Sequence, residues 1–245
     1  MTEVRVDEPA ARAGLSAADT DRLARFARLL LDDPTAPIST RDPAAIRDDH
    51  LADSLVALDL PQVRAATTIA DLGAGAGLPG LCLAIALPAA SIGLVESNAR
   101  KGRFLTRAIV EVPVPNAAVV TARIEEWRDG IGGCDLVTAR ALAPLDVVAE
   151  YAAPLLRMGG TLVVWRGRRD AEAEAEARAA AEILGLEVAD PVPVAPYPGS
   201  EHRHLHLMTK VRPTSDRFPR RTGVARKRPL GSAAARPVGP ARAEG

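Results

Sequence analysis

The sequence predicts an α/β protein with a doubly wound, mostly parallel sheet that is preceded by N-terminal helices. After Pro61, five short and nearly continuous apolar segments alternate with helical segments, and a glycine-rich turn follows the first of them. Of the 245 residues, 47% are hydrophobic, which is enough for one large core. Apolar strands of this kind are buried on both faces of a parallel sheet, and their alternation with helices is typical of βαβ units.

The predicted elements follow one another along the chain. Ser16 caps a first helix that reaches about Leu31, and Asp42-Pro43 begins a second helix. The five strands are TTIADL (67–72), SIGLVE (91–96), AAVVTA (117–122), CDLVTA (134–139) and GTLVVW (160–165). The intervening helices are expected at 79–86, 99–110, 144–156 and 171–184, and two further strands at about 186–192 and 203–210.

This pattern divides the chain into an N-terminal helical extension (1–60), a Rossmann-like domain (61–211) and a Pro- and Arg-rich tail (212–245) that is expected to be disordered in part. Residues 210–245 contain ten Lys or Arg against two acids, although the formal net charge of the chain is zero. A basic segment without an amphipathic apolar face predicts an anionic partner, nucleic acid ahead of a membrane. A solvated tail that only aids solubility is the alternative.

Composition excludes several classes of protein. The longest apolar run, 78–90, contains two prolines and is too short to cross a bilayer. The N-terminus has charges of both signs and no apolar segment of a secretory signal, so a cytoplasmic location is expected. Cys82 and Cys134 lack the spacing of a disulfide framework or a zinc site and are expected in the core. The four histidines have no accompanying Cys or acid cluster, so no metal is expected.

The glycine-rich turn ADLGAGAGLPG (70–80) can be read in two frames. The segment from Gly75 onward fits the dinucleotide pattern G-x-G-x-x-G, whereas Asp71, Gly73, Gly75 and Gly77 place an acid before three alternating glycines. In both frames the glycines allow a ligand close to the backbone at a helix N-terminus. Asp71 favours the second frame, because it would repel a pyrophosphate and attract the ammonium and sulfonium of S-adenosylmethionine. Its alternative role is to cap the helix.

Further polar residues are expected beyond the ends of the other strands. Glu96 ends the second strand and suits the ribose hydroxyls of NAD or S-adenosylmethionine. Glu125 follows the third strand, where an acid and backbone groups could hold an adenine. Arg140 follows the fourth strand, at the mouth of the site, where an Arg can hold a phosphate or a carboxylate.

As a set, these segments resemble the bacterial small-subunit rRNA methyltransferase G family, also called the glucose-inhibited division protein B family. The resemblance covers about 50–230 and is carried by HLADSL (50–55), DLGAGAGLPG (71–80), ESNARKGRFL (96–105), RIEE (123–126), TARA (138–141) and FPRRTGVARKRPL (218–230). It implies a class I S-adenosylmethionine-dependent methyltransferase that modifies N7 of a guanine (position 527 in rRNA numbering) in the 16S rRNA of the small ribosomal subunit. The cofactor contacts that it implies are Gly73, Leu78, Ile124 and Glu125, with Arg140 at the mouth of the pocket. DDPTAPIST and Asp49 depart from the family pattern.

The chemistry implied by the resemblance agrees with the residues. Guanine N7 already presents a lone pair, so the enzyme has to position the base and needs no strong catalytic base. Arg140, Arg166 and Arg203 are available to hold phosphates or the base, and a monomer is expected.

Two alternatives stay open. One is an NAD-dependent oxidoreductase, which would need a residue pair such as Tyr-Lys, yet neither Tyr151 nor Tyr197 has a Lys nearby in the sequence. The other is a non-catalytic RNA-binding protein on the same fold.

Overall fold

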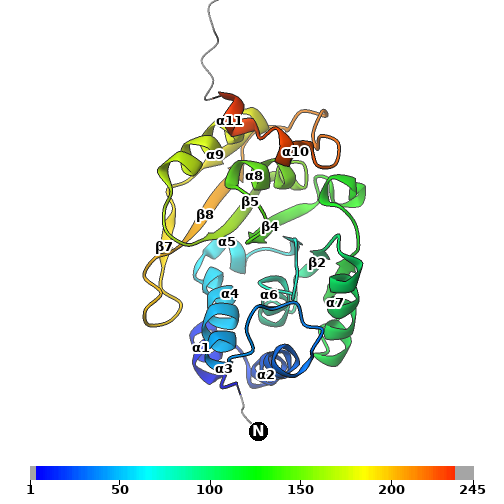
Figure 1. Ribbon diagram of the computed structural model, residues 1–245, viewed down its shortest axis with the longest axis vertical. Coiled ribbons are helices and arrows are strands. Elements are labelled where there is room, and N and C mark those ends of the chain that lie inside the picture. The colour runs from blue at the N-terminus through cyan, green and yellow to red at the C-terminus, as the bar shows by residue number, and fades with distance from the viewer. Residues whose placement is uncertain (1–3, 235–245) are drawn as a thin grey trace, which may run out of the picture.

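The computed structural model describes residues 4–234, which form an eight-stranded sheet with helices on both faces (Figure 1). The strands are β1 (Thr68–Leu72), β2 (Ser91–Val95), β3 (Ala117–Val120), β4 (Cys134–Arg140), β5 (Leu156–Arg166), β6 (Leu186–Val188), β7 (Val192–Val194) and β8 (Arg203–Lys210). Their order is β3-β2-β1-β4-β5-β8-β6, and β7 also pairs with β8. The first five pair in parallel and β8 is antiparallel to β5, which confirms the predicted doubly wound, mostly parallel sheet.

The register of the parallel strands brings their C-terminal ends to one edge of the sheet. Leu72, the last residue of β1, lies opposite Val95 of β2 and Ala139 of β4. Val95 lies opposite Val120 of β3. The loops that follow these four strands therefore meet at one edge, where doubly wound sheets bind their ligands.

Two layers of helices cover the sheet. The helices α6 (Gly80–Ala86) and α7 (Ala99–Glu111) lie on one face, and α8 (Leu145–Ala152) and α9 (Ala171–Leu184) lie on the other (Figure 1). Successive strand residues point to opposite faces, so Ile69 joins the first core and Ala70 the second. Cys82 and Cys134 are buried, one in each core, as predicted.

The N-terminal helices pack against the α6 face and share its core. They are α1 (Asp7–Ala13), α2 (Ala17–Asp32), α3 (Pro43–Ala45), the π-helix η1 (Ile46–Ala52), α4 (Asp53–Leu55), the 3-10 helix η2 (Val56–Asp59) and α5 (Pro61–Arg64). Ser16 and Asp42 cap α2 and α3, as predicted. The sequence analysis missed α1, and it could not foresee η1 because seven residues are too few for apolar periodicity to separate a π-helix from an α-helix.

Two predicted elements have wrong boundaries, both near prolines. The helix expected at 144–156 ends at Ala152, because Pro154 has no N–H to continue it. Leu156 instead begins β5 and pairs with Cys134. The strand expected at 186–192 is divided into β6 and β7 around Pro191, which cannot donate a ladder hydrogen bond.

The segment predicted as a partly disordered tail packs on the protein as far as residue 234. Phe218 and Ala225 are buried in the second core, and the helices α10 (Val224–Lys227) and α11 (Leu230–Ala234) contact α8 and α9. This packing was not predicted, because the few apolar residues of 212–234 are widely spaced among prolines and arginines. Residues 235–245, which share the prediction, lie outside the described residues. We call residues 218–228 the C-terminal strap.

Candidate active site

The glycine-rich turn after β1 adopts a backbone that side chains rarely tolerate. Gly73, Gly75 and Gly77 have φ values of 69°, 59° and 89°, which are costly for residues with a Cβ. A Cβ on Gly77 would lie 2.5 Å from Leu81 Cδ1, and one on Gly73 would lie 2.7 Å from Leu142 Cδ1. The alternating glycines are therefore required by the fold of the turn itself, whichever ligand lies against it.

Asp71 lies beneath the turn and caps α6. Its side chain points to the α6 face. The Oδ2 atom accepts from the Gly80 N–H at 3.0 Å, and the Oδ1 atom accepts from the Thr138 hydroxyl at 2.9 Å. Only 1% of the residue is exposed, and burial raises its pKa to about 7 despite both hydrogen bonds. Asp71 does not line either cavity described below. Because residue 71 shares its strand face with Ile69, the structure shows the capping role that the sequence allowed as the alternative, and a direct contact with a cationic cofactor stays a prediction.

Glu96 follows β2, and its carboxylate binds the backbone of the glycine-rich turn. Its Oε2 accepts from the Gly75 N–H at 3.1 Å and its Oε1 accepts from the Asn98 N–H at 2.7 Å. The residue is buried, with 6% exposed. Each carboxylate oxygen has two lone pairs, so one acceptor position on each oxygen is left for hydroxyl groups of a ligand.

Glu125 lies in the short 3-10 helix η3 (Ile124–Glu126) after β3 and is also buried, with 8% exposed. Its Oε1 accepts from the Gly223 N–H of the C-terminal strap at 2.9 Å. The sequence analysis expected this acid to face a ligand, and it did not foresee that the strap would bind one of the two oxygens. The other oxygen has no hydrogen-bond partner among the described residues and remains an acceptor.

These loops enclose a first cavity of about 280 Å³, near the lower end of the range of small-molecule sites. It is lined by Gly73, Val95, Glu96, Ser97, Lys101, Ala122, Arg123, Ile124, Glu125, Ala141, Leu142, Tyr151, Gly223 and Arg226. Of the predicted cofactor residues, Gly73, Glu96, Ile124 and Glu125 line it. Gly75, Gly77 and Leu78 do not: the two glycines shape the turn, and Leu78 is buried in the first core.

The first cavity fits the nucleoside part of S-adenosylmethionine. Two buried carboxylates offer acceptors to ribose hydroxyls and an exocyclic amine, and the glycine turn lets that ligand approach the backbone. A phosphate-rich dinucleotide fits less well, because Glu96 and Glu125 would oppose its negative charge.

A second cavity of about 530 Å³ adjoins the first, and Ala141 lines both. It is lined by Asp49, His50, Asp53, Arg140, Ala141, Trp165, Arg166, Gly167, Arg168, Asp170 and Arg203. Arg140 therefore belongs to this cavity and not to the first one, where it was expected beside the cofactor. Arg166 lies here as well, at the end of β5.

The charges in the second cavity form a network. Arg140 Nη1 lies 2.9 Å from Asp53 Oδ2 and donates to the Asp49 carbonyl at 3.0 Å. Arg203 Nη1 lies 3.1 Å from Asp53 Oδ1, and its Nη2 pairs with the Asp49 carboxylate, which also accepts from the Tyr197 hydroxyl. Asp49, which departs from the family pattern, therefore contacts Arg140, Arg203 and Tyr197. Arg140 and Arg203 are already paired, so they are less available to phosphates than the sequence analysis expected.

His50 is the polar residue of this cavity that lacks partners. Both ring nitrogens are shielded from solvent, and neither has a hydrogen-bond partner among the described residues. Burial and the charge of Arg140 lower the pKa of His50, so the imidazole is neutral at neutral pH. From the sequence, the histidines were considered only as metal ligands, and no such role was expected for His50. The signal that could have identified it was its place in the HLADSL motif.

Searches of the described residues for other kinds of site gave two results. No group of three or more His, Cys, Asp or Glu residues in 4–234 could hold a metal ion. In the same part of the chain, none of the helices has the length and apolar character needed to cross a membrane.

Comparisons with known proteins agree with the fold and with the motifs. A family model described as rRNA small subunit methyltransferase G matches residues 21–198. The chain is 40% identical over 199 residues to the ribosomal RNA small subunit methyltransferase G of Rubrobacter xylanophilus. The aligned region covers 79% of this chain and 76% of the Rubrobacter protein. It is 41% identical over 193 residues to the protein of the same name from Chloroflexus aggregans, with 78% and 80% covered.

Solved structures show a similar fold at low sequence identity. A SAM-dependent methyltransferase from Aquifex aeolicus superimposes with a TM-score of 0.55 at 14% identity, over 69% of this chain and 94% of that one. The fibrillarin pre-rRNA processing protein of Methanococcus jannaschii gives a TM-score of 0.52 at 18% identity, over 66% and 74%. The family model covers most of the chain, and the fold is similar to that of these solved structures. The chain belongs to the rRNA small subunit methyltransferase G family.

Proposed function

We propose that the protein transfers a methyl group from S-adenosylmethionine to N7 of a guanine in the 16S rRNA of the small ribosomal subunit. The observation that carries this proposal is the pair of adjoining cavities at the C-terminal strand ends, which share Ala141. One offers carboxylates suited to a nucleoside, and the other offers cations and a neutral imidazole suited to a base and its phosphates. Membership of the methyltransferase G family supports the same assignment.

The first cavity would hold the cofactor. S-adenosylmethionine supplies, when bound, an electrophilic methyl group on a sulfonium. Glu96 would bind ribose hydroxyls through its remaining acceptor positions, and Glu125 with the backbone at Ile124 would bind the adenine. Gly73 permits close approach of the ligand. Asp71 contributes indirectly, because it fixes the start of α6 and hence the turn.

The second cavity would hold the target guanosine. Among the described residues, no carboxylate forms an ion pair with Arg166 or Arg168, so both cations are available to phosphates. The Asp53 pairs with Arg140 and Arg203 set the shape of the cavity. Because N7 carries a lone pair, catalysis requires the base to be positioned in line with the methyl group, and no residue has to remove a proton first.

The test is methyl transfer to small subunits that lack the modification. The protein is incubated with subunits and isotopically labelled S-adenosylmethionine, and the nucleosides of the RNA are separated by mass spectrometry. We expect label in 7-methylguanosine. Label in a different methylated nucleoside, or none in RNA, would refute the proposed substrate. Parallel reactions with free 16S rRNA, an assembling particle and the mature subunit identify the form that is used.

A binding experiment separates the cofactor from the substrate. In equilibrium dialysis with S-adenosylmethionine and with NAD, we expect retention of the first only. Retention of NAD alone would overturn the cofactor assignment, whereas retention of S-adenosylmethionine without methyl transfer to any of the RNA substrates would indicate a binding protein.

A further inference from the structure

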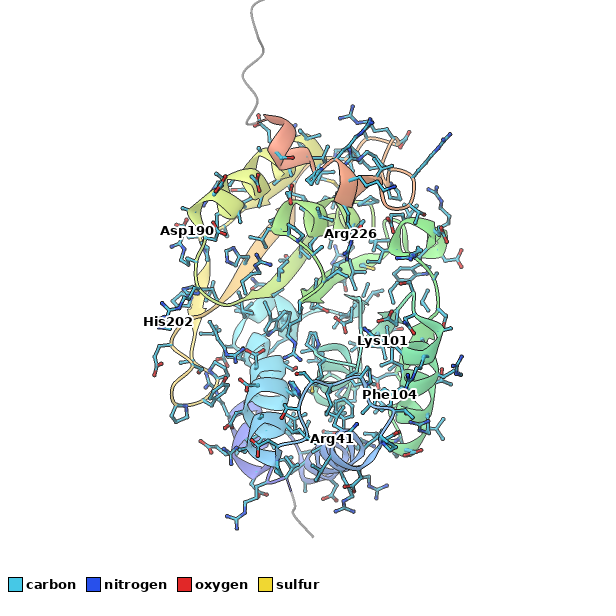
Figure 2. All side chains as sticks on the ribbon, viewed as in Figure 1. Arg41, Lys101, Phe104, Asp190, His202 and Arg226 are labelled. Atoms are coloured by element: carbon cyan, nitrogen blue, oxygen red, sulfur yellow. The ribbon has the colours of Figure 1, made fainter. Side chains whose placement is uncertain are left out.

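The C-terminal strap forms part of the wall of the first cavity. Gly223 and Arg226 line it together with residues of the loops after β1, β2, β3 and β4. The family model ends at residue 198, so this wall lies outside the region that it matches. In Figure 2 the two labelled cations of the cavity, Arg226 and Lys101, come from α10 and α7.

Three hydrogen bonds fasten the strap to the other walls of the cavity. The Gly223 N–H donates to Glu125 Oε1 at 2.9 Å, and the Thr222 hydroxyl donates to Glu126 Oε1 at 2.8 Å. Arg226 Nη2 donates to the Leu142 carbonyl at 2.9 Å. The strap is thereby joined to the loop after β3 and to the loop after β4.

The opposite side of the strap is anchored in the protein interior. Phe218 and Ala225 are buried in the second core, with 5% and 2% exposed. The Arg220 guanidinium forms a bidentate pair with Glu150, which is 1% exposed. A buried carboxylate is costly without such a partner, so this pair holds the strap in one position. The strap is therefore a fixed wall in this structure and not a free tail.

We propose that the C-terminal strap is part of the cofactor site and that Arg226 binds the cofactor at the end of the cavity formed by Ile124 and Glu125. This proposal rests on the proposed function, which supplies the identity of the cofactor. The guanidinium has five N–H donors. The Leu142 carbonyl takes one and the Tyr151 side chain another, so others can meet the ring nitrogens of the adenine of S-adenosylmethionine. Its planar cation also stacks favourably on an aromatic base.

The proposal gives the basic C-terminal segment a role in cofactor binding. Its charge first suggested a partner such as RNA, with no effect on the cofactor. The strap geometry instead implies that removing or loosening the strap weakens cofactor binding in the absence of RNA.

The decisive experiment is calorimetric titration of the RNA-free, full-length protein with S-adenosylmethionine. Arg226→Ala should raise Kd by about tenfold or more, since a charge-assisted hydrogen bond is lost. Lys227→Ala is the matched control: it removes the same charge from the neighbouring position of α10, and Lys227 does not line the cavity. Its Kd should stay within about twofold of wild type. Equal Kd values for the two variants would overturn the proposal.

A second measurement tests the strap without changing a residue that lines the cavity. Thr222→Val removes the hydrogen bond to Glu126 and should raise the cofactor dissociation rate, because the strap opens more often. In wild type, saturating cofactor should slow hydrogen exchange across 218–228. Unchanged dissociation and unchanged exchange would refute the inference.

The two proposals fail in different ways. If wild type binds no S-adenosylmethionine, the proposed function is wrong and the strap assignment falls with it. If wild type binds but Arg226→Ala behaves as Lys227→Ala does, only the strap assignment is wrong.

Discussion

Replacing Asp71 by asparagine isolates the charge of this residue from its capping role. Asp71 accepts hydrogen bonds from the Gly80 N–H and the Thr138 hydroxyl. In Asp71→Asn the amide oxygen can still accept from Gly80, and the amide N–H₂ can donate to the Thr138 oxygen. The Thr138 hydroxyl can then turn to the Ala70 carbonyl, 3.5 Å away. The variant therefore keeps the cap and loses only the ionisable group.

The size of the effect follows from the shifted pKa. Burial raises the pKa of Asp71 from 3.8 to about 7. A group with a raised pKa in the folded state stabilises the fold below its unfolded-state value, and this contribution is lost as the pH rises through the folded-state value. Each pH unit between the two pKa values changes the unfolding free energy by ~1.4 kcal/mol. Over about three pH units, from about pH 4 to pH 7, the unfolding free energy of wild type therefore falls by at most roughly 4 kcal/mol relative to that of Asp71→Asn.

The assay is urea unfolding of wild type and Asp71→Asn at several pH values between about 5 and 8. The difference in unfolding free energy should move in favour of Asp71→Asn by ~1.4 kcal/mol per pH unit up to about pH 7 and then level off. A difference that stays constant over this range would refute the reasoning. Asp71→Ala is the control: it also lacks the ionisable group, but it leaves the Gly80 N–H unpaired, so it should be less stable than Asp71→Asn by about 1–3 kcal/mol at every pH.

Two further predictions concern the site. Arg140→Ala removes one partner of the buried residue Asp53, which is 2% exposed and keeps its second partner, Arg203. The variant should have an unfolding free energy lower by about 1–3 kcal/mol, measured by denaturation. It should also transfer methyl groups more slowly, measured by single-turnover assay. Unchanged stability would show that the pair with Asp53 contributes nothing, and an unchanged rate would remove Arg140 from the site. Gly77→Ala should lower Tm more than Gly132→Ala. Both glycines have positive φ, but a Cβ at residue 77 would contact Leu81, whereas a Cβ at residue 132 has no atom within 4 Å. Equal Tm values for the two variants would contradict the close contact.

Local sequence signals predicted the elements and the glycine turn well. The strands have continuous apolar character, and α2 and α9 begin at the capping residues Ser16 and Asp170. Glu96 and Glu125 were placed correctly at one edge of the sheet, because parallel strands end together. Asp71 was placed in the right turn, and of its two predicted roles the structure shows the cap of α6. The alternation of side chains along β1 could have shown that it points to the α6 face.

The sequence by itself determined the order of strands and helices, the position of the turn and the family to which the chain belongs, since these depend on the pattern of residues close together in the chain. Only the tertiary structure decided how the polar groups are paired. Arg140 meets Asp53, Arg203 meets Asp49, and Gly223 meets Glu125, each across more than 80 residues. Such contacts depend on how distant elements pack, and no local periodicity encodes them. The same packing places Gly223 and Arg226 of the basic C-terminal segment in the wall of the first cavity.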